Sequence, residues 1–174
     1  FFTATKGWDI LKNMKMPKDW KVVVNYSKNF YNTEKSVLGL KGSKIGNQII
    51  NLNKQYLSEE ELSLLFISCD AVFLPYKVCS GSGVMYDGLG HGKPFIASDL
   101  GFFKEFTDMK LGIASNRKPR SFEEAFVELE KKYGNYKTVV NEFRQIISWK
   151  FIARQHYLIY KIISEKQKMA MELT

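Results

Sequence analysis

The sequence predicts a three-layer α/β domain built on about six parallel strands. Short apolar runs alternate along the chain with longer amphipathic stretches, which is the pattern of parallel strands joined by crossover helices. The clearest run, residues 20–26, holds three consecutive valines, as expected of a strand that is covered on both faces. With 174 residues and a hydrophobic fraction of 45%, the chain has enough apolar surface for one domain spanning residues 1–174.

The first half of the chain divides into short strands and helices. Phe1 and Phe2 are expected to end a first strand, which leads through residues 3–7 into a helix. Ser58 precedes three glutamates, and this capping box predicts a helix start. The segments expected here are a helix carrying Trp8, Ile10, Leu11 and Met14, strands at 20–26 and 48–53, a helix at 33–40, and a helix from Ser58 to near Cys69 that buries Leu62, Leu65 and Phe66.

The second half begins with a strand at 71–74 that Pro75 closes. A turn at 78–83 follows and leads into a short helix that ends near His91. Ser121 is expected to cap a later helix. The remaining segments are expected as strands at 94–97 and 111–114, one or two helical turns at 101–106, and helices at 121–132, 136–147 and 149–166.

The net charge of +8 favours acidic partners, namely nucleic acid, anionic lipid or a phosphorylated ligand. The lysines are scattered, with no block of five or six. Three interpretations stay open: a solvated surface, attraction to a membrane surface, and nucleic-acid binding. Nucleic-acid binding is the least favoured of the three, and no nucleic-acid partner is expected, because aromatic and basic residues do not interleave along the chain.

Cysteine and histidine are too scarce for a zinc site. The chain has two of each, and none stand at ligand spacing, so no metal is expected. Cys69 lies in an apolar stretch and is expected to be a small buried hydrophobe. Unpaired cysteines, no apolar run of eighteen residues and no secretion signal predict a cytoplasmic protein, with contact to the membrane surface left open.

Two turns at the expected carboxyl ends of strands carry residues suited to binding a ligand. One is residues 3–7. The other, residues 79–83, sets two hydroxyls and two glycines (Ser80, Gly81, Ser82 and Gly83) before a helix N-terminus. Free amides, close approach at glycine and the helix dipole suit a phosphate group, so this turn is the candidate phosphate site.

The helix after this turn is unusually rich in glycine, with Gly88 and Gly90 inside it and Gly92 just beyond. Each interior glycine destabilises a helix by about 0.8–1 kcal/mol relative to alanine. The backbone is therefore expected to lie close to either a sheet or a ligand. Asp87 lies one turn beyond Gly83, where it is either an acceptor for a ribose diol or an ordinary exposed acid.

Other nucleotide motifs do not fit. A dinucleotide fingerprint starting at Gly81 or Gly88 would need glycine where Tyr86 and Lys93 stand, and neither follows the first strand. A P-loop is also absent. NAD-binding and ATP-hydrolysing classes are therefore disfavoured.

Residues 74–106, LPYKVCSGSGVMYDGLGHGKPFIASDLGFFKEF, resemble the signature region of the group 1 (family 4) glycosyltransferases of GT-B fold. The shared features are a strand ending in Leu-Pro, a Gly/Ser turn, a Gly-Lys-Pro strand start, and a glycine turn followed by glutamate. Similar motifs recur at Lys6-Gly7, at residues 56–62 and at Ser148-Trp149, so the resemblance covers nearly the whole chain.

The resemblance implies a Rossmann-like domain, the C-terminal half of a GT-B enzyme, that binds a nucleoside-diphosphate-sugar and needs no metal cofactor. It places Lys6 at the donor diphosphate as the catalytic cation. The turn Ser80, Gly81, Ser82 and Gly83 holds the distal phosphate and sugar, and Asp87 contacts the ribose. Cys79 stands where the family has the first glutamate of its Glu-x7-Glu motif, and Phe1 where it has an arginine.

The expected function is transfer of a sugar to a glycan or lipid-linked acceptor in polysaccharide biosynthesis. The acceptor domain of the same protein is expected upstream, because the chain opens without methionine at the end of a strand. This chain alone is therefore expected to be inactive, and the helix from about 149 to face the other domain. The alternative is a non-catalytic nucleotide- or phosphate-binding α/β module.

Overall fold

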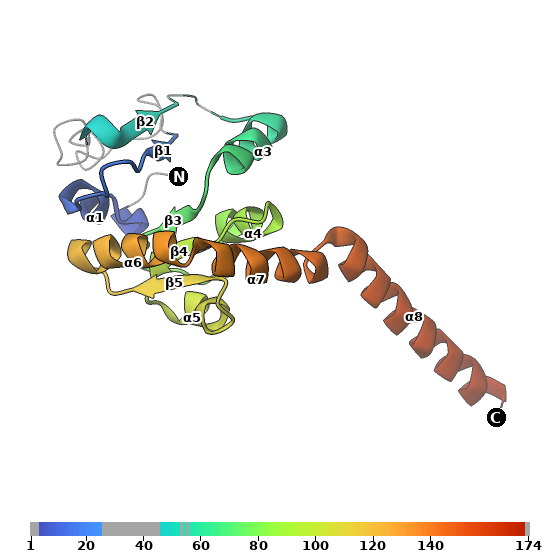
Figure 1. Cartoon of the computed structure of the whole chain (residues 1–174). Coiled ribbons are helices and arrows are strands. Elements are labelled where there is room, and N and C mark those ends of the chain that lie inside the picture. Colours follow the sequence, from blue (N-terminus) through green and yellow to red (C-terminus); the bar gives the residue numbers. More distant parts are fainter. Residues whose placement is uncertain (1–3, 26–45, 53, 55, 173–174) are drawn as a thin grey trace.

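The computed structural model describes residues 4–25, 46–52, 54 and 56–172, and it confirms the α/β architecture (Figure 1). Within these ranges there are five strands, which form two hydrogen-bonded parallel groups. The groups are β1 (Val22–Val24) with β2 (Ile49–Asn51), and β3 (Val72–Leu74), β4 (Phe95–Ser98) and β5 (Gly112–Ser115) in that order. The strand expected at Phe1–Phe2 and the helix expected at 33–40 lie outside the described residues.

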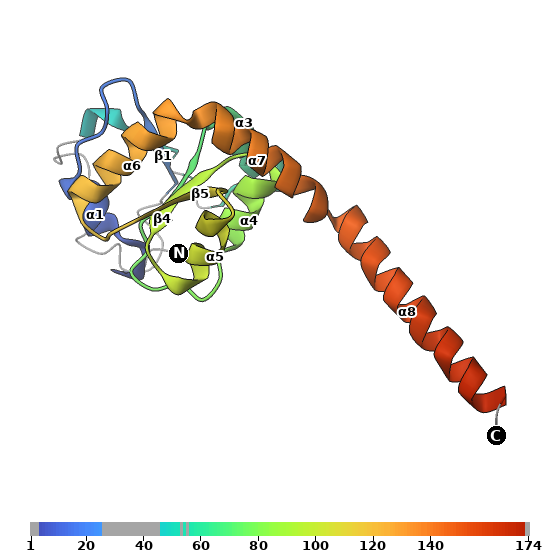
Figure 2. The ribbon, with the colours of Figure 1, turned by 60° about the horizontal axis from the view of Figure 1, so that its bottom comes forward.

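Helices cover both faces of the strands (Figure 2). The bounds are α1 (Trp8–Asn13), α3 (Glu59–Ser68), α4 (Gly83–Gly90), α5 (Gly101–Asp108), α6 (Pro119–Lys131), α7 (Tyr133–Ile146) and α8 (Trp149–Glu172), with 3-10 turns η1 (Ala4–Lys6) and η2 (Gly46–Gln48). α1 and α6 contribute to one hydrophobic cluster, and α3, α4, α5 and α7 contribute to the other.

Strand β4 joins the two clusters and accounts for the three layers. All four of its residues are buried. Ile96 belongs to the cluster of α1 and α6, whereas Phe95 and Ala97 belong to the opposite cluster. Successive side chains of a strand point to opposite faces, so this strand is apolar throughout, as the sequence pattern indicated.

The structure confirms one predicted helix start and corrects another. Ser58 Oγ accepts a hydrogen bond from the Glu61 amide at 3.1 Å, and the Glu61 side chain accepts one from the Ser58 amide at 3.0 Å, completing the capping box. The predicted cap at Ser121 was wrong. Helix α6 already begins at Pro119, with Lys118 at the cap position, because proline presets the backbone of a first helical turn.

Burial on α3 is also lower than predicted. Of the three side chains expected to be buried, only Phe66 is buried, while Leu62 is 36% exposed. Cys69 at the end of this helix is half-buried rather than fully enclosed, and burial raises the pKa of its thiol.

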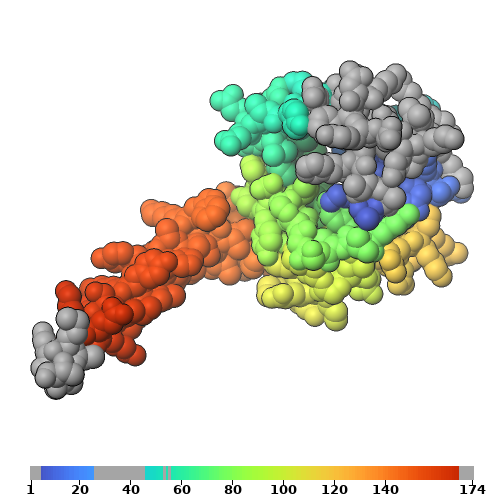
Figure 3. Space-filling view, turned by 180° about the vertical axis from the view of Figure 1, so that it is seen from behind, coloured from blue at the N-terminus to red at the C-terminus, as the bar shows by residue number. Residues whose placement is uncertain are grey.

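The last helix, α8, extends away from the domain beyond the end of α7 (Figures 2 and 3). It runs six residues further than predicted and carries many exposed apolar side chains. These are Trp149, Phe151, Tyr157, Leu158, Ile159, Tyr160, Ile162 and Ile163. No helix in the described part of the chain is long and apolar enough to cross a membrane.

Candidate functional site

The two candidate turns of the sequence lie side by side at the carboxyl end of β3. The amide of Lys77, three residues after this strand, donates a hydrogen bond to the Thr5 carbonyl at 2.7 Å. Gly7 has a positive φ of 74°, and a Cβ on it would stand 1.7 Å from the Pro75 carbonyl oxygen. Only glycine permits this approach, which brings η1 against the loop that leads into α4.

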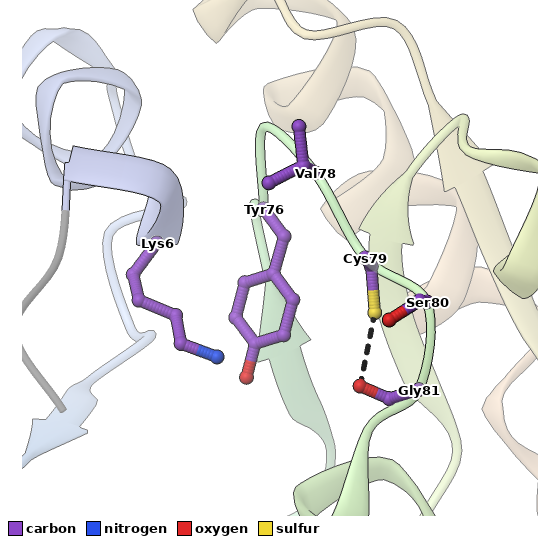
Figure 4. A pocket seen from close by; sticks show the side chains of 6 residues that line it. All are labelled: Lys6, Tyr76, Val78, Cys79, Ser80 and Gly81. Atoms are coloured by element: carbon purple, nitrogen blue, oxygen red, sulfur yellow. Dashed lines mark hydrogen bonds between the residues drawn. The ribbon is translucent and has the colours of Figure 1, made fainter.

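A pocket of about 380 Å³ opens between η1 and this loop (Figure 4). Its lining residues are Lys6, Tyr76, Val78, Cys79, Ser80 and Gly81. The structure therefore brings together Lys6, Ser80 and Gly81 of the predicted site. The Lys6 ammonium lies 3.7 Å from the centroid of the Tyr76 ring, within the range of a cation–π contact.

Lys77 fixes the loop from two sides. Its ammonium forms an ion pair with Asp9 of α1 at 3.0 Å, and its carbonyl accepts a hydrogen bond from Arg117 Nη1 at 3.1 Å. Arg117 follows β5. The loop after β3 is therefore bonded both to α1 and to the loop after β5, at the carboxyl edge of the strands.

Ser82 does not line this pocket. It is buried, and its Oγ accepts a hydrogen bond from the Met85 amide at 3.2 Å, which makes it the N-cap of α4. The side chain thus satisfies one amide of the first turn of α4. In this structure its direct role is to fix the start of the helix.

Gly81, Gly83, Gly88 and Gly90 divide into two groups. A Cβ on Gly88 would stand 2.5 Å from Val72 Cγ2, so this glycine allows α4 to lie close to β3. A Cβ on Gly81, Gly83 or Gly90 would meet nothing within 4 Å. The sheet alternative therefore holds for Gly88, whereas Gly81 and Gly83 have open space in front of the backbone, and a ligand there stays a prediction.

Asp87 is exposed on α4 and does not line the pocket. Its backbone carbonyl accepts from the His91 amide at 3.0 Å and lies 2.7 Å from His91 Nδ1. Within the described residues, its carboxylate has no hydrogen bond or ion pair. It is therefore free to accept a hydrogen bond from a ligand.

Sequence reasoning missed the contributions of Tyr76 and Val78, and placed Cys79 in the candidate turn without giving its thiol a role. Cys79 Sγ donates a weak hydrogen bond to the Gly81 carbonyl at 3.3 Å, which places sulfur in the pocket wall. The position of Tyr76 directly after Leu74-Pro75 at a strand end was the available signal.

Among the described residues, no group of three His, Cys, Asp or Glu side chains could hold a metal ion.

No protein-family model and no curated protein matches this sequence. Solved structures do match. Sucrose-phosphate synthase (tll1590) from Thermosynechococcus elongatus superposes with a TM-score of 0.70 at 14% identity, over 94% of this chain and 44% of that one. Anabaena Alr3699/HepE, in complex with UDP and with UDP-glucose, gives 0.70 at 16% and 15% identity, over 94% of this chain and 46% of that one.

The fold is that of the C-terminal half of a GT-B glycosyltransferase. The chain spans less than half the length of each of these proteins. In a GT-B half, the pocket beside Lys6 lies where doubly wound sheets bind their ligands, at the carboxyl ends of the strands.

Proposed function

We propose that this chain is the nucleotide-sugar-binding half of a glycosyltransferase. The single observation that carries the proposal is the convergence of Lys6 and the Ser80–Gly81 turn on one pocket at the carboxyl end of β3. The GT-B fold and the UDP and UDP-glucose complexes of HepE support a sugar nucleotide as its ligand.

The chemistry that these residues support is stabilisation of a leaving diphosphate. When the bond between sugar and diphosphate breaks, negative charge grows on the diphosphate oxygens. The Lys6 ammonium and the amides at the start of α4 are fixed donors for that charge, so they act most strongly in the transition state. Open space at Gly81 and Gly83 lets phosphate oxygens approach these amides. In this proposal they meet the charge without a metal ion.

Asp87 is proposed to accept hydrogen bonds from the ribose hydroxyls. Its carboxylate is exposed on α4, one helical turn beyond Gly83. The diphosphate would then lie between Lys6 and the helix start, with the nucleoside extending along α4.

The rest of the proposal concerns the whole protein. A second, acceptor-binding half is proposed to complete the cleft, with a glycan or lipid-linked glycan as acceptor in polysaccharide biosynthesis. The exposed apolar side chains of α8 support contact with such a half. A cytoplasmic location at the membrane surface agrees with the net charge of +8.

One observation favours a second candidate, a binding module without transfer activity. Cys79 lines the pocket at the position where the resembling family has a glutamate near the transferred sugar. A thiol supplies only weak hydrogen bonds, so a site of this kind could hold a nucleotide without promoting transfer.

A ligand panel tests the proposal. Isothermal titration of the chain with UDP-, GDP- and ADP-sugars, and with NAD and ATP, is expected to give binding for one class of sugar nucleotide. Lys6→Met should weaken it about tenfold, as expected for a charge-assisted hydrogen bond. The matched control is Lys137→Met on α7, which removes the same charge from beside Tyr133, with 5.8 Å between ammonium and ring centroid. Equal loss in both variants would reject the site.

A further inference from the structure

We infer that Tyr76 is the positioning residue of this site, and that its ring holds the Lys6 ammonium at the pocket without neutralising its charge. The ammonium lies 3.7 Å from the ring centroid, and both residues line the pocket (Figure 4). The inference rests on the proposed function in one respect, that the anion bound there is the donor diphosphate.

The Tyr76 ring is itself held in place. The residue is only 8% exposed, and its ring contacts Phe103 of α5, which is fully buried, with 6.0 Å between centroids. Its amide donates to the Leu74 carbonyl at 2.8 Å. The residues on either side are fixed as well, Pro75 against Gly7 and Lys77 by its bonds to Thr5, Asp9 and Arg117. Tyr76 is therefore a rigid surface for a flexible lysine.

The side chain that contacts the Lys6 ammonium decides whether this lysine can still bind an anion. Among the described residues, Lys6 forms no ion pair, and the carboxylate of Asp9, in the helix that follows Lys6, is paired with Lys77. A carboxylate partner would cancel the charge of Lys6 and repel a diphosphate. The face of an aromatic ring attracts the cation through its quadrupole and carries no net charge. Lys6 is thus oriented while its full charge stays available to an anion.

Preorganisation gives this contact a measurable effect. A lysine side chain has four rotatable bonds, and freezing them on binding reduces affinity. Holding the ammonium before the ligand arrives avoids part of that loss. Removing the ring face is expected to weaken diphosphate binding about two- to fivefold, and only while Lys6 is present.

The test is a double-mutant cycle with UDP as the ligand. Tyr76→Phe keeps the ring face, whereas Tyr76→Leu keeps an apolar side chain and removes the ring. We expect Tyr76→Phe to bind UDP within about twofold of the parent chain, and Tyr76→Leu to bind about two- to fivefold more weakly. In a Lys6→Met background, Tyr76→Leu should change UDP affinity no further. Equal losses in the Phe and Leu variants, or an equal Leu effect without Lys6, would overturn the inference.

A ligand-free measurement separates this inference from the proposed function. Protons above an aromatic face are shifted upfield, so the ε-methylene signal of Lys6 in a proton–carbon spectrum should be upfield in the parent chain and in Tyr76→Phe. It should return to the usual lysine position in Tyr76→Leu. An unshifted signal in the parent chain would overturn the positioning role, whether or not UDP binds. A shifted signal in a chain that does not bind UDP would reject only the proposed function.

Discussion

Gly88 of α4 faces Val72 of β3 with no room for a methyl group between them, since a Cβ there would lie 2.5 Å from Val72 Cγ2. Two residues later in the same helix, a Cβ on Gly90 would meet nothing. Comparing Gly88 with Gly90 therefore separates two contributions to the free energy of unfolding. One is crowding against the sheet, and the other is the intrinsic effect of glycine in a helix.

Gly88→Ala is therefore expected to destabilise the domain by about 1–3 kcal/mol, the usual effect of overpacking. Gly90→Ala should leave stability unchanged or raise it by up to about 1 kcal/mol, because alanine favours the helix. Urea denaturation of the two variants measures the difference. If Gly88→Ala is as stable as Gly90→Ala, α4 does not lie against β3 in this way.

Gly81→Ala should leave the stability of the domain unchanged and weaken the binding of UDP. Its Cβ would meet no protein atom, so the fold should tolerate it. The same Cβ would occupy the space that phosphate oxygens need near the backbone, and UDP should bind at least several-fold more weakly. Urea denaturation measures the stability and titration calorimetry measures the UDP affinity, both on one preparation. Unchanged UDP affinity would move the phosphate away from this turn.

Ser82→Ala should destabilise the domain by about 0.5–2 kcal/mol through loss of the N-cap of α4. Ser121→Ala is the matched control, because Ser121 lies inside α6 rather than at its cap. Combined with Lys6→Ala, Ser82→Ala should reduce nucleoside-diphosphate affinity at least tenfold in a chain that still folds. A folded double variant with parental affinity would contradict the site.

Asp87→Asn should weaken the binding of ribonucleotides and affect sugar phosphates that lack a nucleoside much less. The reason is that an amide is a poorer acceptor than a carboxylate for the two ribose hydroxyls. Parallel titrations with UDP and a hexose 1-phosphate give the comparison. If both ligands lose affinity equally, Asp87 acts as a general charge on the helix.

The chain by itself is expected to bind a sugar nucleotide and to hydrolyse it only slowly. Transfer needs an acceptor held opposite the donor in a cleft that excludes water, and a single half leaves the reactive carbon open to solvent. Turnover of the best-binding donor should be compared with and without a complementing acceptor-binding half. Rapid acceptor-dependent transfer by these 174 residues alone would refute the half-enzyme proposal.

Structural features were predictable from the sequence where residues close by in the chain determine them. The capping box at Ser58 and the apolar run of β4 are of this kind, since both depend on contacts within a few residues or on a simple pattern. Ser121 failed because Pro119 two residues earlier is a competing helix start.

The resemblance predicted that Lys6, Ser80 and Gly81 share one site, but other roles that depend on partners distant in sequence were not predictable. Gly88 and Gly90 are both expected inside the same helix, and only the position of Val72 tells them apart. The role inferred for Tyr76 depends on Lys6, which lies seventy residues earlier in the chain. The fold brings the Lys6 ammonium to 3.7 Å from the centroid of the Tyr76 ring. Leu62 looked like a core residue, yet α3 turns it outward.

The exposed start of α8 gives the protein a built-in optical reporter. Trp149 is 87% exposed, whereas the other two tryptophans, Trp8 and Trp20, are partly enclosed against the cluster beneath α1 and α6. An apolar surface that covers the start of α8 will transfer the indole of Trp149 from water to an apolar environment and shift its emission to shorter wavelength. Fluorescence of the unlabelled chain, with Trp149→Phe as the blank, will therefore follow the burial of the first turn of α8 by a binding partner.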